Sequence, residues 1–107
     1  MSTYSLRSQY EAAVVALGEV ATEMLRSGAS EEDVARWAVA KRNALKQEYR
    51  NLTPAPVVAR IAARTLERYG NAIGPSADEL CVAGKSWREI IDSATRPGDH
   101  DAAFFLR

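Results

Sequence analysis

Three arginines on one predicted helix are the clearest candidates for chemistry in this sequence. Arg60, Arg64 and Arg68 follow one another at intervals of four residues, which places them on one helical face. A row of guanidinium groups suits phosphate, because each group offers a planar fork of hydrogen-bond donors. The row predicts an anion-binding surface. The alternative interpretation is that the arginines pair with acids of the first predicted helix, such as Glu19 and Glu23.

A second basic group, Lys41, Arg42 and Lys46, precedes this row. Lys41 lies four residues from both Trp37 and Leu45, so it interrupts an apolar stripe. A lysine in that position either extends its ammonium group to the edge of the stripe or lies in a polar cleft. In a cleft, it would be a candidate catalytic group.

The joints between helices in the second half of the chain gather further polar side chains. Two predicted helix starts, at Ser76 and Ser86, direct backbone N–H groups outward, and such ends bind anions readily. We expect these joints to form one small space that holds a phosphate. The alternative is a tight connection whose polar groups face water. The candidate residues are Arg68, Tyr69, Asn71, Ser76 and Lys85, with Arg42 or Lys46 as the opposite wall.

The sequence gives no sign of a disulfide, a metal site, a nucleotide-binding loop or a known catalytic set. Cys81 and His100 are the single cysteine and the single histidine, so an internal disulfide is excluded and a zinc site is not expected. The run Gly84-Lys85-Ser86 lacks the preceding strand and the spaced glycine of a nucleotide-triphosphate loop. The sequence shows no Ser–His–Asp set, paired-carboxylate motif or cofactor pattern, so we expect neither a metal nor a cofactor.

Composition indicates one soluble globular domain. The chain has 107 residues, 47% hydrophobic and 26% charged, and no run approaches the ~20 apolar residues that span a bilayer. The N-terminus lacks a signal-peptide pattern, which predicts a cytoplasmic place of action. The net charge is 0, but residues 36–68 carry eight basic and two acidic side chains. Such a field concentrates anionic partners, unless it only assists packing and solubility.

Hydrophobic spacing and capping residues predict an all-α bundle of three longer and two short helices, with no strands. Predicted starts include Ser30, Thr53-Pro54 and Ser86, the last in a capping box with Glu89. The helices are expected near 5–27, 31–50, 54–69, 77–83 and 87–95. They form a single domain, with an N-terminal helix in 1–29, a core of 30–98 and a tail of 99–107. The predicted core residues are Val14, Leu17, Leu25, Val34, Trp37, Leu45, Val57, Ile61, Leu66, Leu80, Trp87 and Ile90.

A family resemblance spans roughly residues 34–98. It is carried by Trp37-Ala38-Val39, Arg42–Lys46, Arg68–Asn71, Ile73-Gly74-Pro75, Gly84–Trp87, Ile90-Ile91 and Ser93–Arg96. In this combination the segments resemble the C-terminal toxin domains of bacterial polymorphic toxins. The resemblance implies a cytotoxic domain that a cognate immunity protein neutralises. The site residues that it implies are Arg42, Lys46, Arg68, Tyr69, Asn71, Lys85 and Arg96.

Toxin domains of this kind attack RNA, DNA, nucleotide cofactors or translation factors. The basic middle segment favours a nucleic-acid or nucleotide substrate over a peptide or a lipid. A metal-independent ribonuclease is one such activity, in which Lys, Arg and Tyr stabilise phosphorane-like charge while a base activates the 2′-hydroxyl.

The competing interpretation is a helical interaction module without catalysis, such as an immunity-like partner, an adaptor or a small DNA-binding protein. As a helix-turn-helix, it would use residues 53–69 as the recognition helix. The regular arginine row on that helix suits phosphate contact better than base reading.

Overall fold

The computed structural model describes residues 3–97, which form five helices and no strand. This confirms the predicted all-α class, and each helix boundary lies within two residues of its predicted position. The elements are α1 (Thr3–Arg26), α2 (Glu31–Leu52), α3 (Ala55–Tyr69), α4 (Ala77–Val82) and α5 (Trp87–Ala94). The predicted tail, 99–107, lies outside the described residues.

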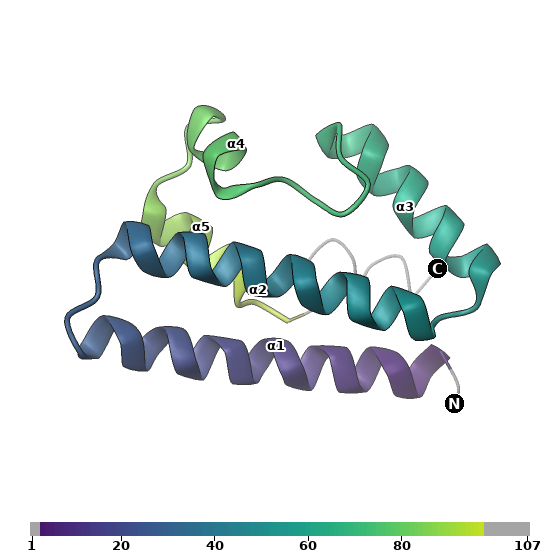
Figure 1. Cartoon of the computed structure of the whole chain (residues 1–107), viewed down its shortest axis with the longest axis horizontal. Coiled ribbons are helices and arrows are strands. Elements are labelled where there is room, and N and C mark those ends of the chain that lie inside the picture. The colour runs from purple at the N-terminus through teal and green to yellow at the C-terminus, as the bar shows by residue number, and fades with distance from the viewer. Residues whose placement is uncertain (1–2, 98–107) are drawn as a thin grey trace.

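The two long helices, α1 and α2, lie side by side as an antiparallel pair (Figure 1). The polar start of α2 follows the predicted pattern, because the Ser30 hydroxyl accepts a hydrogen bond from the backbone N–H of Asp33 at 3.1 Å. Along α1 an apolar stripe is buried at Leu6, Tyr10, Val14, Leu17 and Ala21, and it includes the predicted core residues Val14 and Leu17. The α1–α2 pair is therefore the platform on which the shorter elements pack.

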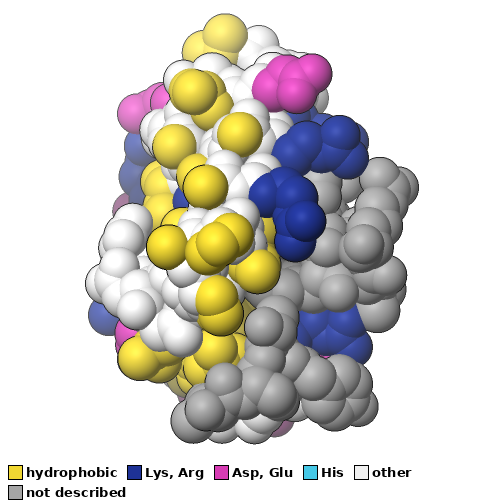
Figure 2. All heavy atoms as spheres, turned by 90° about the vertical axis from the view of Figure 1, so that its right-hand side faces the viewer, with side chains coloured by type: hydrophobic (Ala, Val, Ile, Leu, Met, Phe, Trp, Pro, Cys, Tyr) yellow, Lys and Arg dark blue, Asp and Glu magenta, His cyan; other side chains and the backbone are white. Residues whose placement is uncertain are grey.

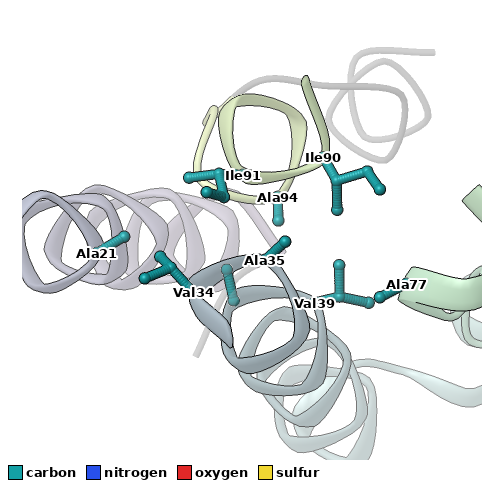
Figure 3. Packing of buried hydrophobic residues seen from close by; sticks show 9 residues of the cluster. Ala21, Val34, Ala35, Val39, Ala77, Ile90, Ile91 and Ala94 are labelled. Carbon is teal, nitrogen blue, oxygen red and sulfur yellow. The ribbon is translucent and has the colours of Figure 1, made fainter. Parts of the chain in front are cut away.

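Helix α5 packs across α2 and closes the core. Ile90, Ile91 and Ala94 of α5 point toward Val34 and Val39 of α2 (Figure 3). Alanines fill the remaining positions of this cluster and allow the helix backbones to approach closely. They are Ala21 of α1, Ala35 and Ala38 of α2, and Ala77 of α4.

Gly18 marks a second close approach, between α1 and the end of α5. A Cβ atom at Gly18 would lie 3.3 Å from the Cβ of Thr95, which is the C-terminal cap of α5. The glycine interrupts the apolar run of the first helix without ending the helix. Its lack of a side chain makes room for α5.

The predicted core is correct at its centre and wrong at one position. Leu66 is 52% exposed, because it lies well to one side of the face of α3 that buries Ile61 and Thr65. Buried as predicted are Val14, Leu17, Val34, Ile61 and Ile90. Half-buried are Leu25, Trp37, Leu45, Val57, Leu80 and Trp87.

The predicted start of the third helix needs a correction. Thr53 ends α2 instead of opening α3: its N–H bonds the Arg50 carbonyl at 3.2 Å and its hydroxyl bonds the Tyr49 carbonyl at 2.7 Å. Pro54 is the N-cap of α3. The residue before a proline is pushed out of the helical region, and Thr53 is extended, with ψ 145°.

Arg50 holds α3 and the loop behind it against α2. Its guanidinium donates to the hydroxyl of Thr65 at 3.3 Å and to the carbonyl oxygen of Ala72. In Figure 1, α3 is inclined to α2 and its far end approaches the side where α4 lies. This placement brings the end of α3 toward the elements that follow it in the chain.

Candidate anion-binding site

A cavity of about 330 Å³ lies between α2, α5 and the joints that connect α3, α4 and α5. This volume is within the range of small-molecule sites. Half of the ten predicted site residues line it, and they come from separate segments of the chain. These are Arg42 and Lys46 of α2, Tyr69 at the end of α3, Lys85 of the α4–α5 turn, and Arg96 after α5.

Arg42 is the most buried cation of the cavity, with 6% of its surface exposed. Its Nε donates to the Tyr10 hydroxyl at 2.7 Å. Its Nη1 donates to the carbonyl oxygens of Ala94 at 2.8 Å and Arg96 at 3.1 Å. Arg42 thus caps the C-terminal end of α5, where the helix dipole favours a cation. The sequence did not reveal this structural role.

The positive charge of Arg42 has no carboxylate partner within residues 3–97. The acceptors of its printed bonds are a hydroxyl and backbone carbonyls, and the ring of Tyr10 lies 5.5 Å from its guanidinium carbon. Its other terminal nitrogen, Nη2, makes no hydrogen bond with the described part of the chain, and the side chain lines the cavity. A guanidinium that is buried and oriented, with no carboxylate partner among residues 3–97, is suited to bind an anion.

The loop between α3 and α4 lies close to the Lys46 side chain. Gly74 is buried there, and a Cβ atom on it would lie 3.0 Å from the Lys46 ammonium nitrogen and 3.3 Å from Asn43 Oδ1. Its φ of +136° also belongs to the region that favours glycine. The absence of a side chain at Gly74 therefore leaves room for the ammonium group of Lys46.

Asn71 and Ser76 serve the backbone of this same joint. The Asn71 side-chain oxygen accepts from the N–H of Ile73 at 2.9 Å, as expected for an asparagine that stabilises its own turn. The Ser76 hydroxyl accepts from the N–H of Glu79 at 3.1 Å and caps α4. Neither residue lines the cavity. In the described structure, both side chains bond to nearby backbone N–H groups.

Two carboxylates, Glu89 and Asp92, also line the cavity. Glu89 completes the predicted capping box, since its carboxylate accepts from the Ser86 N–H at 3.0 Å and the Ser86 hydroxyl accepts from the Glu89 N–H. Two hydrogen bonds with Ser86 lower the pKa of Glu89 below its usual 4.5. The larger effect comes from the Ser86 backbone and the smaller one from the Ser86 side chain. Glu89 is therefore ionised and engaged at neutral pH.

Asp92 is exposed and lies 3.5 Å from the Nε of Arg88. Lys85 and Arg96 are exposed as well, and neither forms an ion pair with another described residue. The cavity therefore combines four basic side chains with two acidic ones. Because basic side chains outnumber acidic ones in its lining, the field inside the cavity favours a bound anion.

The arginine row lies outside the cavity on an exposed face of α3. The alternative interpretation was pairing with acids of the first helix, and Arg60 and Arg68 form no ion pair with Glu19 or Glu23 in the described structure. Glu23 accepts instead from Arg26 of its own helix at 2.9 Å, and Glu19 is exposed without an ion pair to α3. Arg60, Arg64 and Arg68 thus remain a surface feature, and only Arg68 adjoins a cavity residue, Tyr69.

Of the two positions expected for Lys41, the structure shows the one at the edge of the apolar stripe. It is exposed and lines a shallow groove between α1 and α2, together with Trp37 and Leu45. It does not line the cavity that contains Arg42.

Several cavity residues were missed by sequence reasoning, including Asn43, Asp92 and Ser93. Asn43 was recoverable, since it lies three residues before Lys46 on the same helical face. Asp92 and Ser93 carried no signal, because only the packing of α5 on α2 brings them to the cavity.

Within residues 3–97 no cluster of three metal-ligating side chains occurs, and no helix there is long and apolar enough to cross a membrane. Comparisons with protein-family models, curated proteins and solved structures find no match for this chain. A functional proposal must therefore be built on the geometry of the cavity.

Proposed function

We propose that this chain is a cytotoxic effector domain of the polymorphic-toxin kind that binds RNA or a nucleotide in the basic cavity. The observation that carries the proposal is the meeting of Arg42, Lys46, Lys85 and Arg96 around one cavity. The cost of gathering like charges is difficult to explain by stability alone, whereas a bound phosphate offsets it.

The cations have different roles in this proposal. Lys85 and Arg96 are exposed and capture the phosphate from solution. Arg42 is held by Tyr10 and by the end of α5, so it presents charge without having to be ordered when the ligand binds. A pre-oriented guanidinium also stabilises charge that develops on phosphate oxygens during cleavage.

If the domain cleaves RNA, the cavity must also supply a proton acceptor. Glu89 is held by its helix cap, which leaves Asp92 as the carboxylate for this role. The 2′-oxygen would then attack phosphorus as its proton moves to Asp92. The bond to the 5′-oxygen would break, which leaves a 2′,3′-cyclic phosphate, and the departing 5′-oxygen would take a proton from water. Asp92→Asn is expected to abolish cleavage and to retain phosphate binding.

The test combines growth and binding. Inducible expression in bacteria is expected to stop growth and to degrade RNA or deplete nucleotides, and Lys85→Ala/Arg96→Ala is expected to do neither. Arg26→Ala/Lys41→Ala removes the same charge at exposed positions away from the cavity and is the matched control. Full toxicity of the cavity variant, or growth unaffected by the parent chain, contradicts the effector proposal.

A second candidate function, a helical interaction module without catalysis, is favoured by the outer side of the α1–α2 pair. The groove there is lined by apolar side chains such as Val20, Trp37 and Leu45, and Val20 is 49% exposed. An apolar groove between two helices suits the face of a partner protein. In the effector proposal, the cognate immunity protein is such a partner. Partner binding without growth arrest or nucleotide binding would favour this second function.

A further inference from the structure

We infer that two copies of this chain pack together through the groove between α1 and α2, with their α2 helices antiparallel across a two-fold axis. The axis passes α2 between Ala44 and Leu45, so Lys41 of each copy faces Glu48 of the other. The groove shares no lining residue with the basic cavity, so this inference goes beyond the proposed function and does not depend on it. An immunity protein that used the groove would compete with the second copy.

The groove is a mainly apolar surface that the rest of the fold leaves open. Within residues 3–97, its lining comes from α1 and α2 alone, and no residue of α3, α4 or α5 contributes to it. On α2, one face of the helix carries six exposed or half-buried side chains at helical spacing, which we call the α2 stripe. They are Trp37, Lys41, Ala44, Leu45, Glu48 and Leu52. Such an apolar face on a surface helix is typical of a contact with another helix.

The spacing along the α2 stripe is self-complementary. In a two-fold contact between antiparallel helices, residues at equal distances on the two sides of the axis face each other. An axis at the middle of the stripe therefore sets Lys41 against Glu48 and Trp37 against Leu52. Each contact occurs twice, because the axis repeats it. The same stripe thus provides both halves of one interface.

The charges of the α2 stripe determine the orientation of the two copies. Lys41 and Glu48 are both exposed, and neither forms an ion pair with another residue of 3–97. They lie two helical turns apart, about 10 Å along the axis, which is too far for them to pair with each other. An antiparallel second copy supplies each of them with the opposite charge. A parallel copy in the same register would instead bring like charges together, which is unfavourable.

The apolar ends of the α2 stripe also match. Leu52, the last residue of α2, is 59% exposed. The end of the molecule at which α2 passes into α3 faces the viewer in Figure 2, and hydrophobic side chains gather on it. Trp37 is half-buried, and tryptophan is enriched among the side chains that anchor interfaces. Alanines in the groove allow helix backbones to approach closely. They are Ala13, Ala16 and Ala44.

Sedimentation equilibrium of the full chain, from micromolar to millimolar concentration, measures the association. The parent chain is expected to form dimers. Lys41→Glu and Glu48→Lys each set like charges against each other at two places, so each should raise the dissociation constant by about tenfold or more. Arg60→Glu is the control, because it makes the same charge change at an exposed position of α3 and should dimerise like the parent. Circular dichroism establishes that each variant is folded.

A mixture of the two single variants tests the predicted pairing directly. In a dimer of one Lys41→Glu chain with one Glu48→Lys chain, both contacts again join opposite charges, so the mixture should associate with nearly the affinity of the parent. Phosphate binding should be unchanged in both variants, because neither alters the cavity. A monomeric parent overturns the inference and leaves the groove to a partner of another kind. Equal dissociation constants for the parent and Lys41→Glu, or a mixture that associates no better than its components, also overturn it.

Discussion

The Nε of Arg42 in α2 donates a hydrogen bond of 2.7 Å to the hydroxyl of Tyr10 in α1, which links a side chain of the cavity to a helix that contributes no residue to the cavity lining. The Tyr10 ring also meets the Tyr49 ring edge-on, with centroids 5.7 Å apart. Tyr10 therefore orients a buried cation without lining the cavity itself.

Tyr10→Phe is expected to destabilise the fold by about 1–3 kcal/mol, because it removes the acceptor of a buried charged donor. Urea unfolding measures this loss. Tyr49→Phe is the control: its hydroxyl has no hydrogen-bond partner in the described part of the chain, so its effect should be much smaller. Equal stability of the two variants would show that the Arg42 bond contributes little.

Phosphate ligands are expected to stabilise the folded protein. A ligand present at 100 times its dissociation constant contributes about 2.7 kcal/mol if it binds only the native state. Pyrophosphate should raise the melting temperature of the parent chain more than sodium chloride of equal ionic strength. Lys85→Ala/Arg96→Ala should lose this difference, and its persistence in that variant would place the anion elsewhere.

Gly74→Ala is expected to cost about 1–3 kcal/mol, because φ at this position is one that glycine alone adopts readily. The new Cβ would also displace Lys46 or Asn43. Gly28→Ala provides the comparison, since Gly28 also has positive φ, +101°, but has no neighbour within 4 Å of the added atom. Thermal unfolding should show the larger loss for Gly74→Ala, and only that variant should bind phosphate more weakly. A larger loss for Gly28→Ala would contradict the role given to the Lys46 contact.

The capping box at the start of α5 should make stability depend on pH in the acid range. Glu89 has a lower pKa in the folded protein than its usual 4.5, so its contribution is complete above that value and is lost as the pH falls through the folded pKa. Gln at this position also accepts the hydrogen bond but does not titrate. The stability advantage of the parent chain over Glu89→Gln should therefore shrink on acidification. An advantage that is constant with pH would assign the stabilisation to packing.

Local chemistry along the sequence was sufficient to predict the helices. Ser30, Ser76 and Ser86 each cap a helix as predicted, because a cap depends only on residues two or three positions away. Apolar spacing identified the buried face of α1 for a similar reason, since a helix repeats every 3.6 residues whatever its partners are. The sequence also predicted that basic residues meet at one site, and five of the ten predicted site residues line one cavity.

Tertiary structure decided which of these residues are free to act. In the sequence, nothing distinguishes Arg42 from a surface cation, because its hydrogen-bond acceptors lie 32 and 52 residues away. In the fold it is buried and caps the C-terminal end of α5. Leu66 has an apolar side chain, but no element covers its side of α3, so it stays exposed. The sequence by itself determined where helices begin, end and show an apolar face, because these are interactions over about one turn. Only the packing of α5 on α2 determined the cavity and the orientation of its charges. This packing depends on contacts between small alanine side chains, which a periodic sequence pattern does not identify.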